Sequence, residues 1–448
     1  MGERMTTKRA LALSIVRTLR DKGHEAYFVG GSVRDMVRGK KPADFDIASD
    51  AGPELVRSYF KETIPVGQAF GVIIVRLGGH SFEVSTFRAE SDYRDGRRPE
   101  KVEFTDARED ALRRDFTVNG LYYDPLRRRV LDWVSGVRDI RKKVIRTIGD
   151  PGRRFREDKL RLLRAVRFAA NLGFRIEPRT LKAIQKMRKG IAVVSAERVR
   201  DELVKMFTGP RPAEAMDWLD RSRLLEEVLP EIHKLKGVPQ PRQFHPEGDV
   251  YKHTRLLMSK LKNPDAVLAF GCLLHDIGKP PTFRRAKDRI RFHGHDRVGA
   301  RMADALLERL KFSNDLRDRI VACVEGHMRF KDAPHMREAT LRRMFQRATF
   351  AVELEQHRLD CLASHGDLSI WRFVKGRWSR LAREEITPEP YLRGKDLLAL
   401  GFCPGPGIGK ILKEAEEKQL GGEWKSREDA LEWAGKLPRS GTPSSQQQ

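Results

Sequence analysis

The sequence predicts an α+β protein with a small mixed sheet in its first 150 residues and helices in the remainder. Short apolar runs of strand length, such as 27–29 and 72–75, occur before residue 150. From about Phe155 onward, strand patterns nearly vanish and apolar residues recur at the three- and four-residue spacing of amphipathic helices. A chain of 448 residues is long enough for several hydrophobic cores.

The first elements follow from local patterns. Polar and apolar residues near the amino terminus recur at the spacing of an amphipathic helix. Further on, the Gly78-Gly79 pair separates two β-branched runs, as in a hairpin. A polar stretch with a glycine then predicts a loop. In chain order we expect a helix over 8–20, strands over 26–29, 45–48, 72–76 and 81–87, and a loop over 93–99.

Four domains are predicted. The α+β domain spans residues 1–150, a first helical domain 151–235, and a histidine-bearing helical domain 236–385. A helical tail covers 386–448, and its last residues from Pro438 are rich in Pro, Ser and Gln, which predicts disorder.

The charge balance predicts a polyanionic partner. The chain has 88 Lys and Arg residues against 63 Asp and Glu, a net charge of +25 and a pI near 10.1. Because the excess is spread along the chain, nucleic acid is the first candidate and an anionic membrane surface the second. No run of eighteen apolar residues and no signal-peptide core is present, which disfavours membrane and export functions. Four widely spaced cysteines predict reduced thiols in a cytoplasmic protein.

The stretch from Gly30 to Asp46 predicts a site for a metal and a nucleotide. A glycine pair, Gly30-Gly31, follows a buried strand, and Asp44 and Asp46 follow fourteen positions later. Alternation along a strand places the two carboxylates on one face, where they can share Mg²⁺ with substrate phosphates. Glycine lets backbone N–H groups approach a triphosphate. A lone D-x-D is more often a solvated pair, but the preceding block, which includes Ser32 and Arg34, favours a nucleotidyl-transfer centre.

Two further segments add candidate residues. Glu83 lies on a predicted strand, where it could orient or deprotonate an attacking hydroxyl; a plain exposed strand carboxylate explains it equally well. Arg113 and Arg114 can reach phosphate or ribose, and Asp115 and Asn119 can contact a 3′-hydroxyl. The alternative for this segment is a helix end with its own salt bridges.

A third pattern predicts base selection. We expect residues 157–164 to form one helix in which Asp158, Arg161 and Arg164 share a face. Asp158 can only accept hydrogen bonds and Arg161 can only donate them. Together they complement the Watson–Crick edge that cytosine and adenine share, whereas guanine and uracil would leave a group unpaired. In isolation, such a pair is more often a surface salt bridge.

The region 236–385 holds a set of candidate metal ligands. Neutral imidazole and carboxylate together suit Mn, Ni, Co or Fe as well as Zn or Mg. One buried histidine is usually structural, but an ordered set is much less often so. The set is His253, His275, Asp276, His293, His295, His327 and Asp360.

Five blocks in order resemble the class II tRNA nucleotidyltransferase and bacterial poly(A) polymerase family, over most of residues 20–235. The resemblance implies a polymerase-β-like head with Mg²⁺ on Asp44 and Asp46, and a helical neck in which Asp158 and Arg161 read the base. It implies addition of C, C and A to tRNA 3′ ends from CTP and ATP without a template. The blocks are Gly30–Asp46, the strand of Glu83, Arg113–Thr117, Glu157–Arg161 and Ser195–Glu202.

Members of this family differ in product. A flexible loop that CC-adding members are expected to lack is similar to Asp92–Glu100, which disfavours CC addition alone. Full CCA addition leads, and addition of A alone and poly(A) synthesis remain alternatives.

The histidine set resembles the HD phosphohydrolase superfamily. The resemblance implies His253, His275, Asp276 and Asp360 as core ligands, with the further histidines supporting a second metal. Such a domain could remove 2′,3′-cyclic phosphate or phosphate from damaged tRNA ends, or be a relic that only packs. A phosphohydrolase with an RNA-binding amino-terminal half is the rival enzyme hypothesis, and an RNA-binding scaffold is the non-enzymatic one.

Overall fold

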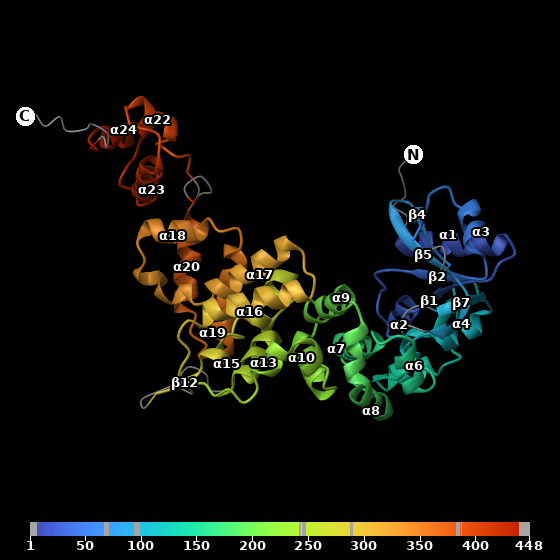
Figure 1. Cartoon of the computed structure of the whole chain (residues 1–448). Helices are drawn as coiled ribbons and strands as arrows, with labels where there is room; N and C mark the ends of the chain where they lie inside the picture. The colour runs from blue at the N-terminus through green and yellow to red at the C-terminus, as the bar shows by residue number, and fades with distance from the viewer. Residues whose placement is uncertain are drawn as a thin grey trace, which may run out of the picture. The chain divides into compact units, whose positions relative to one another are not determined.

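A seven-stranded mixed sheet forms the centre of the amino-terminal part (Figure 1). The strand order is β3-β4-β5-β2-β1-β8-β9, and β2 and β5 are a parallel pair among antiparallel neighbours. The hairpin predicted around Gly78-Gly79 is β4 and β5. The strands are β1 Ala26–Val29, β2 Asp46–Ser49, β3 Thr63–Pro65, β4 Val72–Leu77, β5 His80–Thr86, β8 Tyr122–Asp124 and β9 Arg129–Leu131.

The computed structural model describes residues 7–66, 71–93, 99–241, 243, 248–286, 290–381, 386 and 388–438. The chain divides into two compact units. Unit 1 is Met1–His233 with Arg309–Phe312, and unit 2 is Lys234–Glu308 with Ser313–Gln448. The predicted domain boundaries at 150 and 385 fall inside these units and stay predictions. The predicted disordered terminus, from residue 439, lies outside the described residues.

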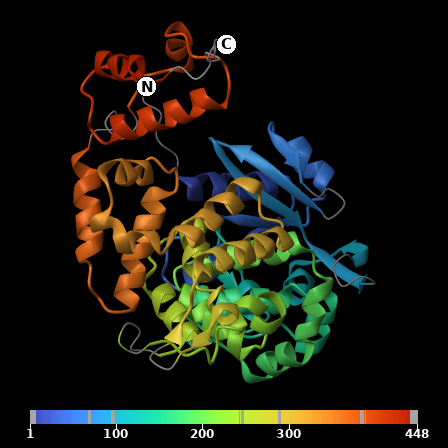
Figure 2. The same ribbon diagram turned by 60° about the vertical axis from the view of Figure 1, so that its left-hand side comes forward.

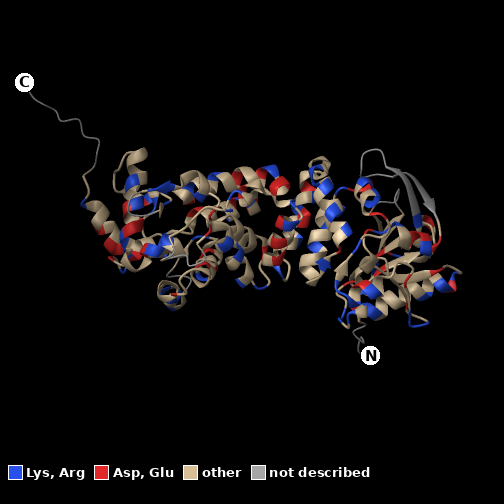
Figure 3. Cartoon of the chain, turned by 90° about the horizontal axis from the view of Figure 1, so that it is seen from below, with Lys and Arg blue, Asp and Glu red and all other residues tan. Residues whose placement is uncertain are grey.

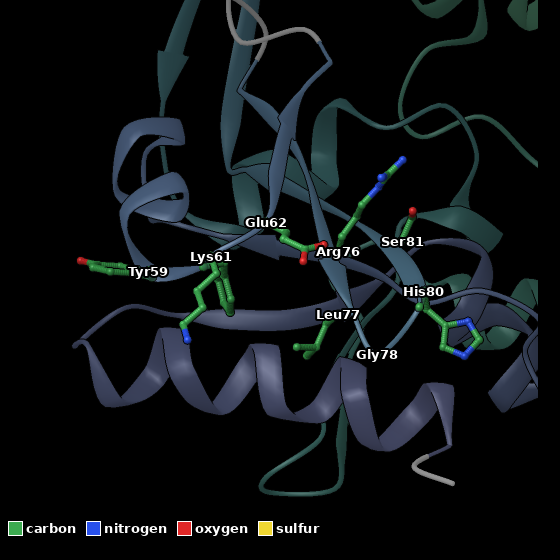
Figure 4. Close-up of a pocket in the computed structure, with 10 residues that line it drawn as sticks. Tyr59, Lys61, Glu62, Arg76, Leu77, Gly78, His80 and Ser81 are labelled. Atoms are coloured by element: carbon green, nitrogen blue, oxygen red, sulfur yellow. The ribbon is translucent and has the colours of Figure 1, made fainter. Parts of the chain in front are cut away.

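Both faces of the sheet are covered by helices. The helix α1 buries an apolar stripe that includes Ile15 and Leu19, and it runs along one face of the sheet (Figure 4). On the other face, Ala107 and Ala111 pack against strand residues in one core cluster. The helices of this part are α1 Lys8–Asp21, α2 Gly31–Val37, α3 Pro53–Tyr59, α4 Ala107–Arg113 and α5 Gly136–Arg141. A separate hairpin, β6 Arg88–Tyr93 with β7 Pro99–Phe104, leaves residues 94–98 of the predicted loop outside the described residues.

The remainder of unit 1 is helical apart from β11 Arg175–Ile176, which pairs in parallel with β10 Val144–Ile145. The helix predicted over residues 157–164 is wrong. Asp158 has extended backbone angles and ends α6, and α7 starts only at Arg161. The cause is local, because Asp158 Oδ1 accepts the Leu160 N–H at 3.0 Å, a turn that competes with the helix. The helices are α6 Pro151–Glu157, α7 Arg161–Leu172, α8 Pro178–Met187, α9 Ala196–Phe207 and α10 Pro212–Arg221.

Unit 2 is almost entirely helical. Its central helix α14, Ala266–Leu274, has buried residues on all sides, as expected for a helix enclosed by others. It contacts α13 Val250–Lys260, α17 Asn314–Gly326 and α19 Phe350–Ala363. The unit also contains α16 His295–Arg309, and its described strands are β12 Arg284–Arg285 and β13 Ile290–Arg291. Near the carboxyl terminus lie α22 Gly394–Ala399, α23 Pro406–Leu420 and α24 Arg427–Gly435, drawn in red in Figure 2. Their buried residues form a core cluster of their own.

The predicted α+β class is confirmed. Lysine and arginine are distributed over both units, as the sequence indicated (Figure 3). Among the described helices, none has the length and apolarity that crossing a bilayer requires. Three of the cysteines, Cys272, Cys323 and Cys361, are buried free thiols, and Cys403 is exposed.

Candidate active site and metal centre

Asp46 and Glu83 are neighbours on the central parallel strands. Ile47 of β2 pairs with Val84 of β5. Asp46 and Glu83 directly precede these two residues, so they lie opposite each other in the next register position and point to the same face of the sheet. Desolvation raises the pKa of Glu83, and the charge of Asp46 raises it further. Desolvation likewise raises the pKa of Asp46, Arg114 opposes the shift, and Asp44 adds to it. Both side chains remain open to solvent, so this face carries a concentrated negative charge that a cation would neutralise.

Asp44 lies just before β2 rather than in it. The strand begins at Asp46, one residue later than predicted, and the Asp44 side chain is 76% exposed. Lys8 at the start of α1 donates to Asp44 Oδ1. The three carboxylates therefore share one edge of the site and differ in exposure. Such a set of oxygen ligands fits Mg²⁺, which needs few carboxylates when phosphates complete its coordination.

Arg114 connects the glycine turn with this acidic face. Gly30 has a φ of +68°, and a Cβ there would lie 3.3 Å from Arg114 Nη1, so the turn requires glycine. Arg114 donates to Asp110 and to the Tyr122 hydroxyl, and its charge opposes the rise that desolvation causes in the pKa of both Asp46 and Glu83. The sequence offers no reason to weight Arg114 above Arg113. The end of α4 and the carboxylates on the face of the sheet come together only in the folded chain.

Four of the predicted nucleotide-binding residues form one hydrogen-bonded chain. Arg34 Nη1 donates to Asn119 Oδ1 at 2.9 Å, and Asn119 Nδ2 donates to Asp115 Oδ1 at 3.3 Å. Arg164 Nη2 completes the chain at 2.6 Å from Asp115 Oδ2. The Ser32 hydroxyl is turned away from this chain and donates to the Val29 carbonyl at 2.9 Å. Asp115 and Asn119 are buried, so the chain fixes α7 relative to α2.

Arg113 matches the plain alternative for its segment. Its guanidinium donates to Asp110 Oδ1 at 2.6 and 2.9 Å, an ion pair within the last turn of α4. Asp110 is buried, and despite its desolvation the two arginines that follow lower its pKa. A phosphate contact of Arg113 would have to compete with this pair.

The two predicted base readers do not contact each other. Asp158 Oδ2 accepts from Arg198 Nη2 at 2.8 Å, and Arg161 Nη1 donates to Glu157 Oε2 at 2.6 Å. Glu157 and Arg198 are partners that sequence reasoning missed, although both stand in the matched blocks. The premise that Asp158 and Arg161 share a helix face is wrong because the helix breaks between them.

Arginines also tie this segment to the main chain at the end of α4. Arg154 Nη2 donates to the Leu112 carbonyl, and its Nη1 lies 3.4 Å from the Arg113 carbonyl. Arg161 Nη2 reaches the same Arg113 carbonyl at 3.5 Å. Carbonyls in the last turn of a helix lack helical partners, so these guanidinium groups cap α4.

A cavity of about 640 Å³ lies elsewhere in the amino-terminal part, at the tip of the β4–β5 hairpin (Figure 4). Arg76 and Ser81 are register partners there, and both point to the face opposite α1. The lining includes none of Asp44, Asp46 or Glu83. This hollow is therefore separate from the candidate active site.

Six of the predicted metal ligands converge in unit 2. They form two groups whose ligand atoms lie within 4.8 Å of one another, and no other such group occurs among the described residues. His253 Nε2 lies 2.9 Å from Asp360 Oδ1, and His275 Nε2 lies 3.1 Å from Asp276 Oδ2. The groups are His253, His275 and Asp360, and Asp276, His295 and His327. His293 is exposed and stands outside both.

The tautomers of three of these histidines fit metal binding. Because a carbonyl can only accept, Nδ1 must be the protonated nitrogen in His275, His295 and His327, which face the carbonyls of Cys272, Phe292 and Val324. The lone pairs of His295 Nε2 and His327 Nε2 then face each other across 3.1 Å. A cation relieves that repulsion. Burial lowers the pKa of His295 and, with the neighbouring histidines, lowers that of His327 to about 4, so both rings are neutral at pH 7.

Lys279 was not among the predicted ligands, yet it faces the same centre. It is buried, with Nζ 2.7 Å from Asp276 Oδ2 and within hydrogen-bond distance of Gln240 Oε1 at 2.5 Å. Despite desolvation, His275 and Lys279 hold the pKa of Asp276 well below its usual range. A lysine beside a metal ligand is visible in the sequence only as an ordinary helix-start residue.

Comparison with known proteins identifies the domains. Residues 26–146 match the poly A polymerase head domain, residues 173–236 the probable RNA and SrmB-binding site of polymerase A, and residues 248–367 the HD domain. A CCA-adding enzyme of Enterococcus faecalis is 30% identical over 437 residues, which cover 96% of each chain. The chain belongs to the family of the CCA-adding enzymes. A CCA-adding enzyme of Bacillus pumilus is 44% identical over 224 residues, and that match spans only 56% of its length.

A solved structure of the family has the same fold. The CCA-adding enzyme of Bacillus stearothermophilus, in complex with CTP, has a TM-score of 0.72 and 27% identity, with 95% of this chain and 96% of that chain covered. A Thermotoga maritima CCA-adding enzyme complexed with tRNA has a TM-score of 0.58 at 18% identity, which is a likeness of fold. The expected CCA-adding family and HD domain are thus confirmed.

Proposed function

We propose that this chain adds C, C and A to the 3′ ends of tRNA from CTP and ATP, without a template. The observation that carries the proposal is the adjacency of Asp46 and Glu83 on β2 and β5, beside Arg114 and the Gly30 turn. The 3′-hydroxyl oxygen of the RNA forms a bond to the α-phosphorus, the bond from that phosphorus to the bridging oxygen breaks, and pyrophosphate leaves. Asp44 and Asp46 would hold Mg²⁺, which would supply stabilisation of the negative charge that develops during the transfer.

The chain's own residues position the substrates. We assign Glu83 to orient or deprotonate the 3′-hydroxyl, and the turn at Gly30 and Gly31 to hold the triphosphate through backbone N–H groups. In the same proposal Ser32 supports the turn, while Arg34, Arg113, Asn119 and Arg164 are the polar groups around the nucleotide. Asp158 and Arg161 read the base after exchanging their present partners, Arg198 and Glu157. Positioning of this kind accounts for most of the rate in phosphoryl transfer.

Nucleotide incorporation tests the proposal. A tRNA transcript that ends at the discriminator base is incubated with CTP alone, ATP alone or both, and product lengths are read on a sequencing gel. We expect two residues with CTP and three with both. No incorporation of C contradicts the proposal: a single added A then assigns A addition, and a long tail with ATP assigns a poly(A) polymerase.

We also propose that the HD domain is a metal-dependent phosphodiesterase or phosphatase that acts on 2′,3′-cyclic phosphate or phosphate ends. Its metal is a divalent ion of the Mn, Ni, Co, Fe or Zn class, suited to the mixed imidazole and carboxylate set. The double variant H275A/D276A should lose this activity and keep nucleotide addition. Equal loss of both activities contradicts independent sites. Three buried free thiols favour a reducing compartment, and we place the enzyme in the cytoplasm.

A further inference from the structure

The hairpin that precedes His295 is basic and packs on the HD centre. It consists of β12 and β13, in which Arg284 pairs with Arg291 and Arg285 with Ile290. Of the four residues between the strands, 287–289 lie outside the described part of the chain. Both Arg284 and Arg285 are exposed, and neither forms an ion pair with any described residue. Two arginine side chains are thus held in solvent beside a candidate phosphohydrolase centre.

The base of the hairpin is fixed to the metal ligands by aromatic contacts. The Phe292 ring lies 6.4 Å from the His295 ring and 5.9 Å from the Phe283 ring, measured between centroids. The Phe292 carbonyl accepts from His295 Nδ1 at 2.8 Å, and Lys279 Nζ stands 5.4 Å from the centre of the Phe292 ring. Phe292, the residue that follows β13, therefore contacts both His295 and Lys279.

Strand alternation shows which arginine follows the aromatic side. Phe283 precedes β12 and Phe292 follows β13, so continuing the register makes them a cross-strand pair, as their ring contact requires. Arg285 is two residues after Phe283 and stands on that side, on the order of 7 Å along the strand. Arg284 points to the other side with Arg291. Arg285 is therefore the arginine on the side of the hairpin that carries Phe283 and Phe292.

We infer that the hairpin of Arg284 and Arg285 is a docking element for the RNA backbone next to the HD centre. The preferred substrate of this centre is then the phosphorylated end of an RNA strand and not a free mononucleotide. The inference rests on the proposed phosphohydrolase function. Arginine matches the phosphate geometry bidentately. A mononucleotide has no upstream phosphate to reach the arginines, whereas an RNA strand does.

Substrates of different length test the inference. The full-length protein with Mn²⁺ is given an RNA hairpin that ends in a 2′,3′-cyclic phosphate, and separately 2′,3′-cyclic AMP. The variant R284Q/R285Q should lose about tenfold in kcat/KM on the RNA, mainly through KM, and the loss should be confined to the RNA. Its dependence of log kcat/KM on log salt should flatten by about one unit. The control R337Q removes the charge of an 87% exposed arginine of the same unit and should leave kcat/KM unchanged on both substrates.

A second measurement does not depend on hydrolysis. Hydrogen exchange of residues 279–295 is followed on addition of a 3′-phosphorylated RNA hexamer, with expected protection in the wild type and little in R284Q/R285Q. Protection that survives both substitutions, or equal loss of activity on RNA and on cyclic AMP, overturns the docking role. Hydrolysis of neither substrate by the wild type, with protection intact, contradicts the proposed phosphohydrolase while the docking role stands.

Discussion

The guanidinium of Arg164 on α7 forms an ion pair with the carboxylate of Asp115, with Nη2 and Oδ2 2.6 Å apart. The other carboxylate oxygen accepts the Phe116 N–H at 2.8 Å and Asn119 Nδ2 at 3.3 Å, so this buried carboxylate is fully hydrogen-bonded. The pair joins the segment after α4 to the helix that starts at Arg161. Loss of either partner should therefore affect both stability and the nucleotide site.

The variant R164A should lower the free energy of unfolding by about 2–4 kcal/mol, because it leaves a buried carboxylate without its cation. Although burial alone would raise it, Arg164 and Arg161 keep the pKa of Asp115 below its ordinary value. A depressed carboxyl pKa stabilises the fold above the unfolded value near 4, and this contribution is lost as pH falls further. The deficit of R164A in urea denaturation should thus shrink below about pH 4. R153A, at a 74% exposed arginine, is the control; an equal deficit there refutes the assignment.

The carboxylates of Asp46 and Glu83 should limit stability while they support catalysis. Their pKa values are raised, so above those values the ionised pair disfavours the folded state, and neutralising one acid should raise the melting temperature at pH 7. D46N should lose about 10³-fold in CTP incorporation and E83Q about 10²-fold. Mg²⁺ should raise the melting temperature of the wild type more than that of D46N. The control is D50N, at a residue just beyond β2, which should leave CTP incorporation unchanged. Unchanged incorporation in D46N contradicts the metal site.

Glu157 should act on base selection through Arg161. The carboxylate holds Arg161 Nη1 at 2.6 Å and Arg154 Nη1 at 2.9 Å, and these arginines lower the pKa of Glu157 against its desolvation. In E157Q the charge that orients Arg161 is gone, so we expect about tenfold lower selectivity for CTP over UTP. Single-nucleotide incorporation measures the ratio. E214Q, which removes an exposed i,i+3 partner of Arg211, should leave the ratio unchanged; a fall in both variants points to a general loss of structure.

The HD domain should become less stable in mild acid when it is free of metal. The pKa of His327 is lowered to about 4 by burial and by His275 and His295. A histidine with a depressed folded pKa is neutral when folded and takes up a proton on unfolding, so stability falls as pH drops from about 6.5 to 4, by on the order of 3 kcal/mol. Denaturation in a chelating buffer between pH 7.5 and 5 measures the slope. H327Q should flatten it, and the same slope in both proteins contradicts the prediction.

Sequence patterns predicted those features that depend on periodicity and on ordered motifs. Alternation placed Glu83 on the exposed side of its strand, and the glycine pair marked the turn before α2. The register between β2 and β5 requires the whole sheet, since the residues that pair are 37 positions apart. The break at Asp158 was missed because the Asp158 side chain accepts a hydrogen bond from the backbone N–H of Leu160, two residues later, and this local turn competes with the helix that the periodicity predicted. The division of six ligands into two groups, and the place of Lys279 beside them, depend on the packing of several helices.

The capping of α4 by Arg154 and Arg161 means that the segment we propose to read the base takes its position from main-chain oxygens. No side-chain replacement at Leu112 or Arg113 can remove those acceptors. The backbone at the end of α4 thus positions this segment. We therefore expect insertion or deletion of a residue at the end of α4 to alter which nucleotide is accepted, even where the side chains of Leu112 and Arg113 are kept.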